Sequence, residues 1–537
     1  MTNFRKPKKP KELRKDKVLK DIEKKKTEAI EEKVSDDLDA NLQTLKRILG
    51  EKTGDLVIRR FYIGANKDFS AAAAFIDGLA DKTVIDQFIL KTSMLDNRGM
   101  ALDPNEPVTK KDLFEIVKKY SLTINELEET DEIKKAIRSM LNGDTAIFID
   151  GNEKAFGANT KGWEHRSVEE PKAEAVIRGP REGFTETLRV NTALIRTRLK
   201  DPDLRIKHFA VGERTNTNIA IAYVEGVCEP TLLDQVERRI KKIEIDGVVG
   251  SGYIEQLIED NHWTPFPTIQ YTERPDKAVA NLLEGRIIII VDGTPFTLIA
   301  PAVFTQFYQS PEDYYERFWI GSFIRLIRLV ALFLSLLAPS LYIAFTAFHP
   351  EMIPPDLVVS IAAGRATVPF PSVIEAFIME ISIEILREAA IRLPGMIGPT
   401  IGIVGALVIG QAAVQAGLVS PLMVIIVSLT TISSFASPSY NAAISVRLIR
   451  FPMMIMAGTF GLYGIMLLLL LVFLHICTLK SFGVPYIAPI APSHIFDLKD
   501  VVFRAPLQWM ERRPVTVDPV DDVRLNSKKQ GGGGNGQ

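Results

Sequence analysis

The stretch from Met453 to Cys477 reads MMIMAGTFGLYGIMLLLLLVFLHIC, and its only Asp, Glu, Lys, Arg or His is His475. About 20 apolar residues allow an α-helix to cross ~30 Å of hydrocarbon. Backbone groups in lipid must be satisfied within their own segment, so such runs are helical. Apolar runs fill most of residues 318–477, whereas residues 1–315 read as soluble protein. The sequence therefore predicts a soluble α/β region of two subdomains followed by an all-α, polytopic membrane domain.

The charges and cysteines indicate the surroundings of the soluble region. A net charge of −1 predicts no nucleic-acid partner. Residues 5–33 are dense in Lys and Glu, which predicts a disordered, solvated tail or, alternatively, contact with anionic lipid headgroups. No hydrophobic signal follows this start, so we expect the N-terminal domain on the cytosolic side. Cys228 and Cys477 are expected to be core residues without a disulfide.

Shifts in composition divide the chain into five predicted parts. A basic disordered tail occupies residues 1–36, and two α/β subdomains follow at 37–150 and 151–315. The transmembrane helical domain is expected at 316–480 and a C-terminal tail at 481–537. Helices that alternate with strands in the soluble region imply layered α/β architecture.

Hydrophobic periodicity predicts the elements of the soluble region. In the first subdomain we expect strands at Asp55–Ile63 and Thr145–Asp150, and helices at Ala71–Ala80, Thr109–Tyr120 and Ile124–Met140. In the second we expect helices at Arg189–Leu199 and Pro230–Lys242, and strands at Arg205–Gly212, Asn218–Val224 and, last, Arg286–Val291.

Signatures of catalysis are missing from the sequence. It has no Gly-x-x-x-x-Gly-Lys-Ser/Thr loop, no His-Glu-x-x-His and no Gly-x-Ser-x-Gly elbow. The six histidines are scattered without metal-ligand spacing. We therefore expect no enzyme activity, no cofactor and no metal site.

One long block carries a resemblance to a known family. Residues 251–317 read SGYIEQLIEDNHWTPFPTIQYTERPDKAVANLLEGRIIIIVDGTPFTLIAPAVFTQFYQSPEDYYER. This block closely resembles the A subunit of the GerA-family spore germinant receptors. The likeness continues in shorter motifs, which are RGP at 178–180, NTALIR at 191–196, VPFP at 368–371, EILREA at 384–389, RLP at 392–394 and IGQAAV at 409–414.

The resemblance implies a role in nutrient-triggered germination, in the inner membrane of the spore. It implies two partners, a transporter-like B subunit and a lipoprotein C subunit. It also implies a ring-like homo-oligomer that forms an ion channel. An A-like paralogue of the same family acts beside the dipicolinate-release machinery, and the motifs do not separate the two.

The same block contains candidates for coupling between the soluble and membrane parts. Prolines fix the backbone around Glu273, Arg274, Pro275 and Asp276, which we expect to form a loop. Tyr314, Tyr315 and Trp319 are expected to anchor the chain at headgroup level. The block is a structural junction on one interpretation and a gating coupler on the other.

The membrane half contains four firm spans and two ambiguous segments. The firm spans are predicted at Ile320–Phe348, Gly395–Ser420, Pro421–Ala436 and Met453–Cys477, and the ambiguous segments are Leu357–Pro369 and Ser372–Arg392. Leu357–Pro369 suits a re-entrant or broken helix. Arg447 and Arg450 are expected in the linker before the last span.

Segment 372–392 carries the candidates for an ion path. On a helical wheel Glu380, Glu384, Arg387 and Glu388 fall within ~100°. In a ring this stripe would place several carboxylates per Arg along a cation path. Alternatively the helix lies at the membrane interface, with Glu384–Arg387 and Glu388–Arg392 pairs on its wet face.

These observations leave two rival functions beside the channel. A secondary transporter would normally have about ten spans and an internal repeat, and this chain shows too few of either. A non-conducting scaffold would dock the B and C subunits through the soluble domain. Because four to six helices cannot easily enclose a water path alone, a channel requires several copies of the chain.

Overall fold

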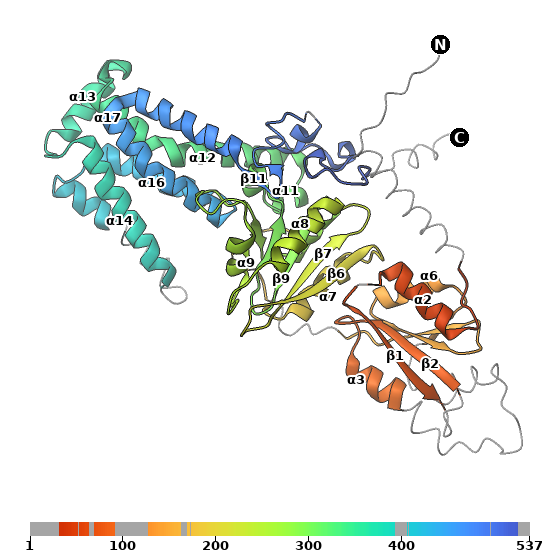
Figure 1. The fold of residues 1–537 in the computed structure, drawn as a ribbon. Coiled ribbons are helices and arrows are strands. Elements are labelled where there is room, and N and C mark those ends of the chain that lie inside the picture. The colour runs from red at the N-terminus through yellow and green to blue at the C-terminus, as the bar shows by residue number, and fades with distance from the viewer. Residues whose placement is uncertain are drawn as a thin grey trace, which may run out of the picture. The chain divides into compact units, whose positions relative to one another are not determined.

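The computed structural model describes residues 32–51, 53–63, 69–91, 127–162, 169–171, 173–392, 405, 408–494 and 496–524. The chain forms two compact units, which Figure 1 shows from red to blue along the sequence. The α/β unit contains residues up to 259 together with 269–301 and 507–537. The helical unit contains residues 260–268 and 302–506. The domain boundaries predicted from the sequence stay predictions.

The first half of the α/β unit is built on a five-stranded antiparallel sheet with the order β1-β2-β4-β5-β3. Its strands are β1 (Leu56–Ile63), β2 (Phe69–Ile76), β3 (Leu127–Thr130), β4 (Thr145–Ile149) and β5 (Ala155–Ala158). Its helices are α2 (Leu38–Leu49), α3 (Lys82–Val84), the π-helix η1 (Ile85–Lys91) and α6 (Ile133–Leu141). Helices α2 and α6 pack their buried leucines and isoleucines on one face of the sheet, while η1 covers the other.

The second half repeats this architecture. Its sheet has the order β6-β7-β9-β10-β8, which is the order of the first sheet with the strands renumbered. The strands are β6 (Leu204–Val211), β7 (Thr217–Val224), β8 (Gln270–Thr272), β9 (Ile287–Val291) and β10 (Thr297–Ala300). The helices are α7 (Leu188–Arg198), α8 (Pro230–Lys241), α9 (Ser251–Ile258) and α10 (Pro275–Leu283).

Matching hydrogen bonds accompany the repeated strand order of the two halves. Asn41 in α2 accepts from the backbone N–H of Ser35 and donates to its carbonyl, and Asn191 in α7 does the same with Thr185. Asp150 after β4 caps the start of α2 in the way that Asp292 after β9 caps the start of α7. Side chains that cap helices and turns set local geometry, so the same caps recur wherever the same turn recurs.

Most of the expected elements of the α/β unit are confirmed, but the helix expected at Ala71–Ala80 is wrong. These residues contribute to β2, which pairs with β1 and β4. Alanine has the highest intrinsic helix propensity, and here tertiary context overrides it. Ala72 and Ala74 face one core and Ala71 and Ala73 the other, so the period is that of a strand buried on both faces.

Three other expectations need correction. The helix expected at Ile124–Met140 is divided into β3 and α6, and its first residues lie outside the described part. The strand at Arg286–Val291 is not the last, because β10 follows it. Strands β5 and β8 and helices α9 and α10 were not expected. The predicted helix Thr109–Tyr120, like the basic tail before residue 32, lies outside the described residues.

The helical unit begins with the 3-10 helix η4 (Phe304–Tyr308) and the short α11 (Glu312–Tyr315). Its longer helices are α12 (Phe318–Ala347), α13 (Pro355–Arg365), α14 (Ser372–Arg392), α16 (Pro421–Phe435) and α17 (Tyr440–Thr478), and residues 408–415 are also helical. Between α12 and α13 lies η5 (Pro350–Met352), and the two-stranded ribbon of β11 (Lys480–Ser481) and β12 (Val484–Pro485) follows α17. Three short 3-10 helices complete the chain, η6 (Asp497–Asp500) in this unit and η7 (Leu507–Trp509) and η8 (Val515–Val517) in the α/β unit.

Helix α17 is folded back on itself at Gly461, so the single span expected at Met453–Cys477 is wrong. Gly461 has φ 61° and ψ −140°, a conformation that glycine reaches at little cost. Ser445 donates to the carbonyl of Pro265, while the hydroxyl of Thr264 lies 2.9 Å from Nε2 of His475. On a straight helix residues 445 and 475 would be ~45 Å apart, so contacts with neighbouring residues require two antiparallel arms.

Within the described residues, α12 and α17 are long and apolar enough to cross a membrane. Helix α16, expected as a span, has 15 residues and is a shorter apolar helix. Residues 395–404 and 406–407 of the expected span Gly395–Ser420 lie outside the described residues. The C-terminal region therefore is helical with two candidate apolar spans.

Candidate functional site

Helix α14 holds four glutamates along its length, and arginines from three helices pair with three of them. Glu375 and Glu380 are completely buried, although both are acidic. Buried carboxylates require paired charges or strong hydrogen bonds. The resulting set, here called the ion-pair ladder, consists of Arg365 with Glu375, Arg450 with Glu380, and Arg387 and Arg447 with Glu384.

The deepest rung joins α14 to the first arm of α17. Nη1 of Arg450 donates to Oε2 of Glu380 over 2.6 Å, and both side chains are 1% exposed. The other carboxylate oxygen, Oε1, and the Nε and Nη2 atoms of Arg450 are buried without a hydrogen-bond partner among the described residues. This rung is therefore a single-contact ion pair with polar atoms left over.

The next rung is shared by two arginines. Arg387 donates to Oε1 of Glu384 over 2.6 Å, and Arg447 from α17 donates to Oε2 over 3.2 Å. Arg387 also donates to the hydroxyl of Ser434 in α16 over 3.2 Å. The Glu384 carboxylate thus links the helices α14, α16 and α17.

The first rung lies near the start of α14. Arg365 at the end of α13 pairs with Glu375 at 3.0 Å and donates to the carbonyl of Phe370. The second oxygen of Glu375 accepts from the backbone N–H of Ser420 at the start of α16. Glu375 therefore fixes the ends of two helices.

The structure changes the electrostatics expected from the sequence. Arg447 and Arg450 are not in a linker but inside α17, where they face Glu384 and Glu380. Arg387 is therefore not the only cation opposite the α14 carboxylates. The signal that could have found the others is the spacing of Arg447 and Arg450, three residues apart on an apolar helix, which matches carboxylates four apart on α14.

Of the predicted ion-path residues, Glu388 is not part of the ion-pair ladder. Glu388 is exposed, and the side chain of its expected partner Arg392 lies outside the described part of the chain. The Glu384–Arg387 pair is present at 2.6 Å. The role of Glu380, Glu384, Arg387 and Glu388 in ion conduction stays a prediction.

The coupling candidates form the start of a helix rather than the expected loop. Pro275 is the first residue of α10, a position at which its fixed φ and missing N–H are harmless. Arg274 is 1% exposed and donates to the carbonyls of Glu174 and Pro180 and to the Asp276 carboxylate. Glu273 accepts from the backbone N–H of Ala173. These contacts attach segment 173–184 to α10 inside the α/β unit.

A second buried arginine joins the two repeats of the α/β unit. Arg196 in α7 makes a bidentate contact with Asp55 before β1, at 2.6 and 3.2 Å. It also donates to the carbonyls of Asp201 and Leu204. The side chains are 1% and 3% exposed, so this pair holds the repeats together from within.

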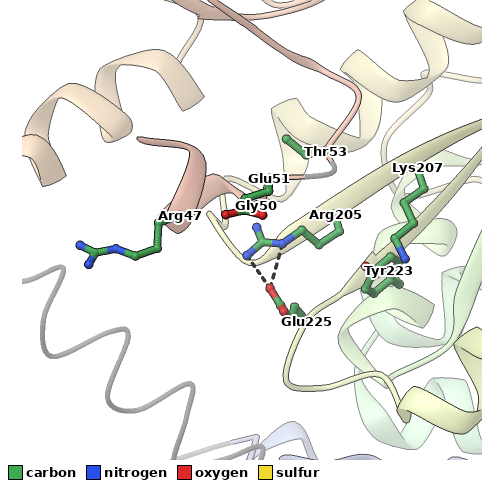
Figure 2. Close-up of a pocket in the computed structure, with 8 residues that line it drawn as sticks. All are labelled: Arg47, Gly50, Glu51, Thr53, Arg205, Lys207, Tyr223 and Glu225. Carbon is green, nitrogen blue, oxygen red and sulfur yellow. Dashed lines mark hydrogen bonds and ion pairs between the residues drawn. The ribbon is translucent and has the colours of Figure 1, made fainter. Parts of the chain in front are cut away.

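A pocket of about 430 Å³ lies close by, between the repeats, and Figure 2 shows its lining. Arg205 points across it to Glu225 and also donates to the carbonyls of Ile48 and Leu49. The pKa of Lys207, which burial alone would lower, is raised by its hydrogen bond to Glu237. Because these cations already have internal partners, the lining is better suited to holding the repeats than to binding a charged ligand.

At the start of α12 a third network joins distant segments of the helical unit. Asp313 is 1% exposed and accepts from Arg325 at 2.8 Å and from Arg328 at 2.7 Å. Arg325 also donates to Asp500, which lies 175 residues away in sequence, at 2.7 Å. The pairing of Arg325 with Asp500 could not be predicted from the sequence, because Asp500 lies in the expected C-terminal tail.

Comparison with known proteins assigns this architecture to a family. The family model described as "Bacillus/Clostridium GerA spore germination protein" matches residues 43–516. This chain belongs to the GerA family. The resemblance inferred from residues 251–317 is therefore confirmed.

Two relatives from Bacillus subtilis cover nearly the whole chain. Spore germination protein KA is 46% identical over 491 residues, which are 91% of this chain and 88% of that protein. The uncharacterized membrane protein YfkQ is 44% identical over 90% of this chain and 92% of its own length. The N-terminal domain of the A subunit of the Bacillus megaterium spore germinant receptor GerK3 is 34% identical over 51% of this chain and 98% of that structure, with a TM-score of 0.40. The relative named a germination protein is not named as an enzyme, and the expectation of no enzyme activity stays a prediction.

Proposed function

We propose that this GerA-family chain is the A subunit of a nutrient receptor in the spore inner membrane. In this proposal several copies form a ring, and the ring passes ions when the complex senses nutrient. The transporter-like B subunit and the lipoprotein C subunit are its partners, and the α/β unit lies on the cytosolic side. Family membership, the apolar helices α12 and α17 and the ion-pair ladder support it.

The observation that carries the proposal is the rung between Glu380 and Arg450. Ionisable side chains at membrane depth are costly and typically mark ion pathways or switching elements. Here a carboxylate on α14 and a guanidinium on α17 are held by one hydrogen bond, and polar atoms on both remain without partners among the described residues. Such a pair neutralises charge in a closed state, and separation of the helices would expose it to water and ions.

The shape of α17 supports the proposal of several membrane crossings. Its arms, residues 440–460 and 462–478, are roughly 31 Å and 25 Å long at 1.5 Å per residue. Each arm is close to the thickness of the hydrocarbon core, and α12 provides another crossing. We therefore propose a polytopic topology in which the hairpin turn at Gly461 lies at a membrane surface.

Conductance of the purified receptor in planar bilayers tests the channel. Glu384→Gln with Glu388→Gln leaves the buried Glu380–Arg450 pair intact and should lower cation conductance or alter ion selectivity in assembled receptor. The matched control is Glu351→Gln, an exposed glutamate of the helical unit outside α14. Unchanged conductance and selectivity in the double variant would place the ion path away from α14.

The second candidate is a scaffold that docks B and C without conducting. Pairing of Glu375, Glu380 and Glu384 with arginines favours it, because paired charges also serve to lock a helical bundle. A fully assembled, nutrient-responsive receptor that passes no current would establish the scaffold. Crosslinking in native membranes should give a homo-oligomeric ladder for the channel, and a strictly monomeric A subunit would exclude the ring.

A further inference from the structure

Two segments of the helical unit, the start of α12 and residues 496–504, expose large apolar side chains. Trp319 at the start of α12 is 74% exposed, and Phe496 in the segment 496–504 is 70% exposed. The other exposed members of this set, here called the girdle, are Ile320, Phe323, Leu498 and Phe503. Exposed apolar side chains gathered in this number mark a contact surface.

Hydrogen bonds place the segment beside the first turns of α12, as Figure 1 shows for the dark blue chain near α11. The backbone N–H of Arg504 donates to the hydroxyl of Ser322 over 3.1 Å, and that hydroxyl lies 3.3 Å from the Arg504 carbonyl. At 100° per residue, Trp319 and Phe323 lie roughly 60° and 100° from Ser322, whereas Ile320 lies roughly 160° from it. The exposed apolar side chains of α12 therefore spread from beside the Ser322 contact to the opposite face of the same turns.

Several hydrogen bonds attach the segment to the rest of the helical unit, although it has little regular structure. Arg325 donates to the carbonyl and the carboxylate of Asp500, both over 2.7 Å, and Gln309 donates to the same carbonyl over 2.6 Å. Tyr314 donates to the Asp500 carboxylate over 2.5 Å. The exposed apolar side chains of this segment therefore lie on backbone that is attached to η4, α11 and α12 through Asp500.

The chemistry of this surface matches one environment. Turns and a short 3-10 helix leave backbone polar groups that hydrocarbon cannot satisfy, so the segment does not lie inside the membrane core. Exposed Phe side chains are equally unsuited to bulk water. Aromatic rings with basic neighbours favour headgroup level, and Lys499 lies 5.2 Å from the centre of the Phe496 ring.

We propose that the girdle binds the boundary between headgroups and acyl chains of a phospholipid bilayer, and that segment 496–504 is a membrane-interface element. The proposal rests on the membrane placement of α12 given under the proposed function. It places the membrane surface at the turns of α12 from Ser322 to Arg328, where Arg325 bonds to Asp500, and leaves residues 329–347, roughly 28 Å of helix, to cross the hydrocarbon.

Spin labels on the full-length chain in vesicles of phosphatidylethanolamine and phosphatidylglycerol test the proposal. Labels are introduced by Phe503→Cys and, separately, Phe496→Cys, in a background with Cys477→Ser because Cys477 is exposed. Cys228 is retained, since it is buried and burial raises the pKa of its thiol above the usual range, which suppresses labelling. Collision with oxygen, which prefers lipid, and with a water-soluble nickel chelate measures the depth of each label.

Two reference labels calibrate depth. Leu470→Cys on α17 should report hydrocarbon, and Ile177→Cys in the α/β unit, 90% exposed, should report water. Labels at 496 and 503 are expected between the two. Asp500→Asn should loosen the segment and increase the mobility of the label at 503.

The outcomes separate this proposal from the function itself. If the labels at 496 and 503 match the water reference while the label at 470 lies in hydrocarbon, the girdle is wrong and the membrane placement stands. Shielding of both labels from both reagents would mean a protein partner and would also overturn the proposal. A label at 470 in water would contradict the membrane placement, and the girdle with it.

Discussion

Two ion pairs in this chain are equally buried but very differently bonded. In the α/β unit, Arg196 makes a bidentate contact with Asp55 and two further hydrogen bonds to carbonyls. In the helical unit, Arg450 makes one hydrogen bond with Glu380, and two of its nitrogens have no partner among the described residues. Side-chain exposure is at most 3% in both pairs.

The difference follows from the surrounding backbone. Arg196 lies at the end of α7 next to the turn before β6, where carbonyls are free to accept hydrogen bonds. Arg450 lies inside α17 and faces α14. The backbone carbonyls of both helices already accept hydrogen bonds within their own helix. The first pair is therefore suited to permanent structure, whereas the second can change partners at lower cost.

The comparison predicts the largest loss of stability at Arg196. Arg196→Ala leaves Asp55 charged and buried without its partner, so the free energy of unfolding should fall by about 4 kcal/mol. Thermal unfolding of the full-length chain in detergent measures this change. Arg181→Ala is the control, because its pair with Glu170 is exposed, and should change stability by about 0.5 kcal/mol or less. Equal effects of the two variants would contradict the structural role of Arg196.

A somewhat smaller loss is expected at the helical pair. Glu380→Gln or Arg450→Gln alone should destabilise the helical unit by about 3 kcal/mol, since each leaves one buried charge. The temperature at which half of the receptor loses its monodisperse peak on size-exclusion chromatography reports the effect. The exchange of Glu380→Arg with Arg450→Glu should recover most of the loss. If the exchange is no better than the single variants, the pair does not act as a unit.

Arg274 should show an intermediate effect that separates structure from coupling. Arg274→Ala leaves the carbonyls of Glu174 and Pro180 without a donor, which should cost about 2 kcal/mol. If the residue couples the units, nutrient-triggered germination should also fall at matched protein levels. Deletion of the basic tail, residues 2–31, should be tolerated and stops before Glu32, which pairs with Arg47. Greater damage from the tail deletion than from Arg274→Ala would reverse the assignment.

The smallest expected effect on stability concerns Glu255, a largely buried carboxylate close to Glu259. Burial and the neighbouring Glu259 raise the pKa of Glu255 to about 7 from its ordinary value of 4.5. Between these values the folded chain holds more protons than the unfolded chain, so the free energy of unfolding falls as the pH rises. Glu255→Gln should therefore be more stable than wild type at pH 8, by about 1 kcal/mol, and should match it near pH 4. Melting temperatures across this range measure the difference, and the exposed Glu244→Gln should leave the pH dependence unchanged.

The sequence was most informative where local pattern and tertiary context agree. The strand at β1, the helices α7, α8 and α14 and the start of α12 were found within a few residues. It was least informative where both faces of an element are buried, as in the alanine-rich β2. The repeated architecture of the α/β unit was also missed, since it is visible in the strand order and in caps such as Asn41 and Asn191.

By itself the sequence determined the family, the division between soluble and apolar halves and the presence of charge on α14. These depend on residue identities and on periods of a few residues, which can be read locally. Only the tertiary structure decided that Arg447 and Arg450 face Glu384 and Glu380, that Asp500 meets Arg325 and that α17 turns back at Gly461. Each of these is a choice of partner across tens to hundreds of residues. Such choices are made by packing: the spacing of Arg447 and Arg450 indicates that they share a helix face, but not which carboxylates that face meets.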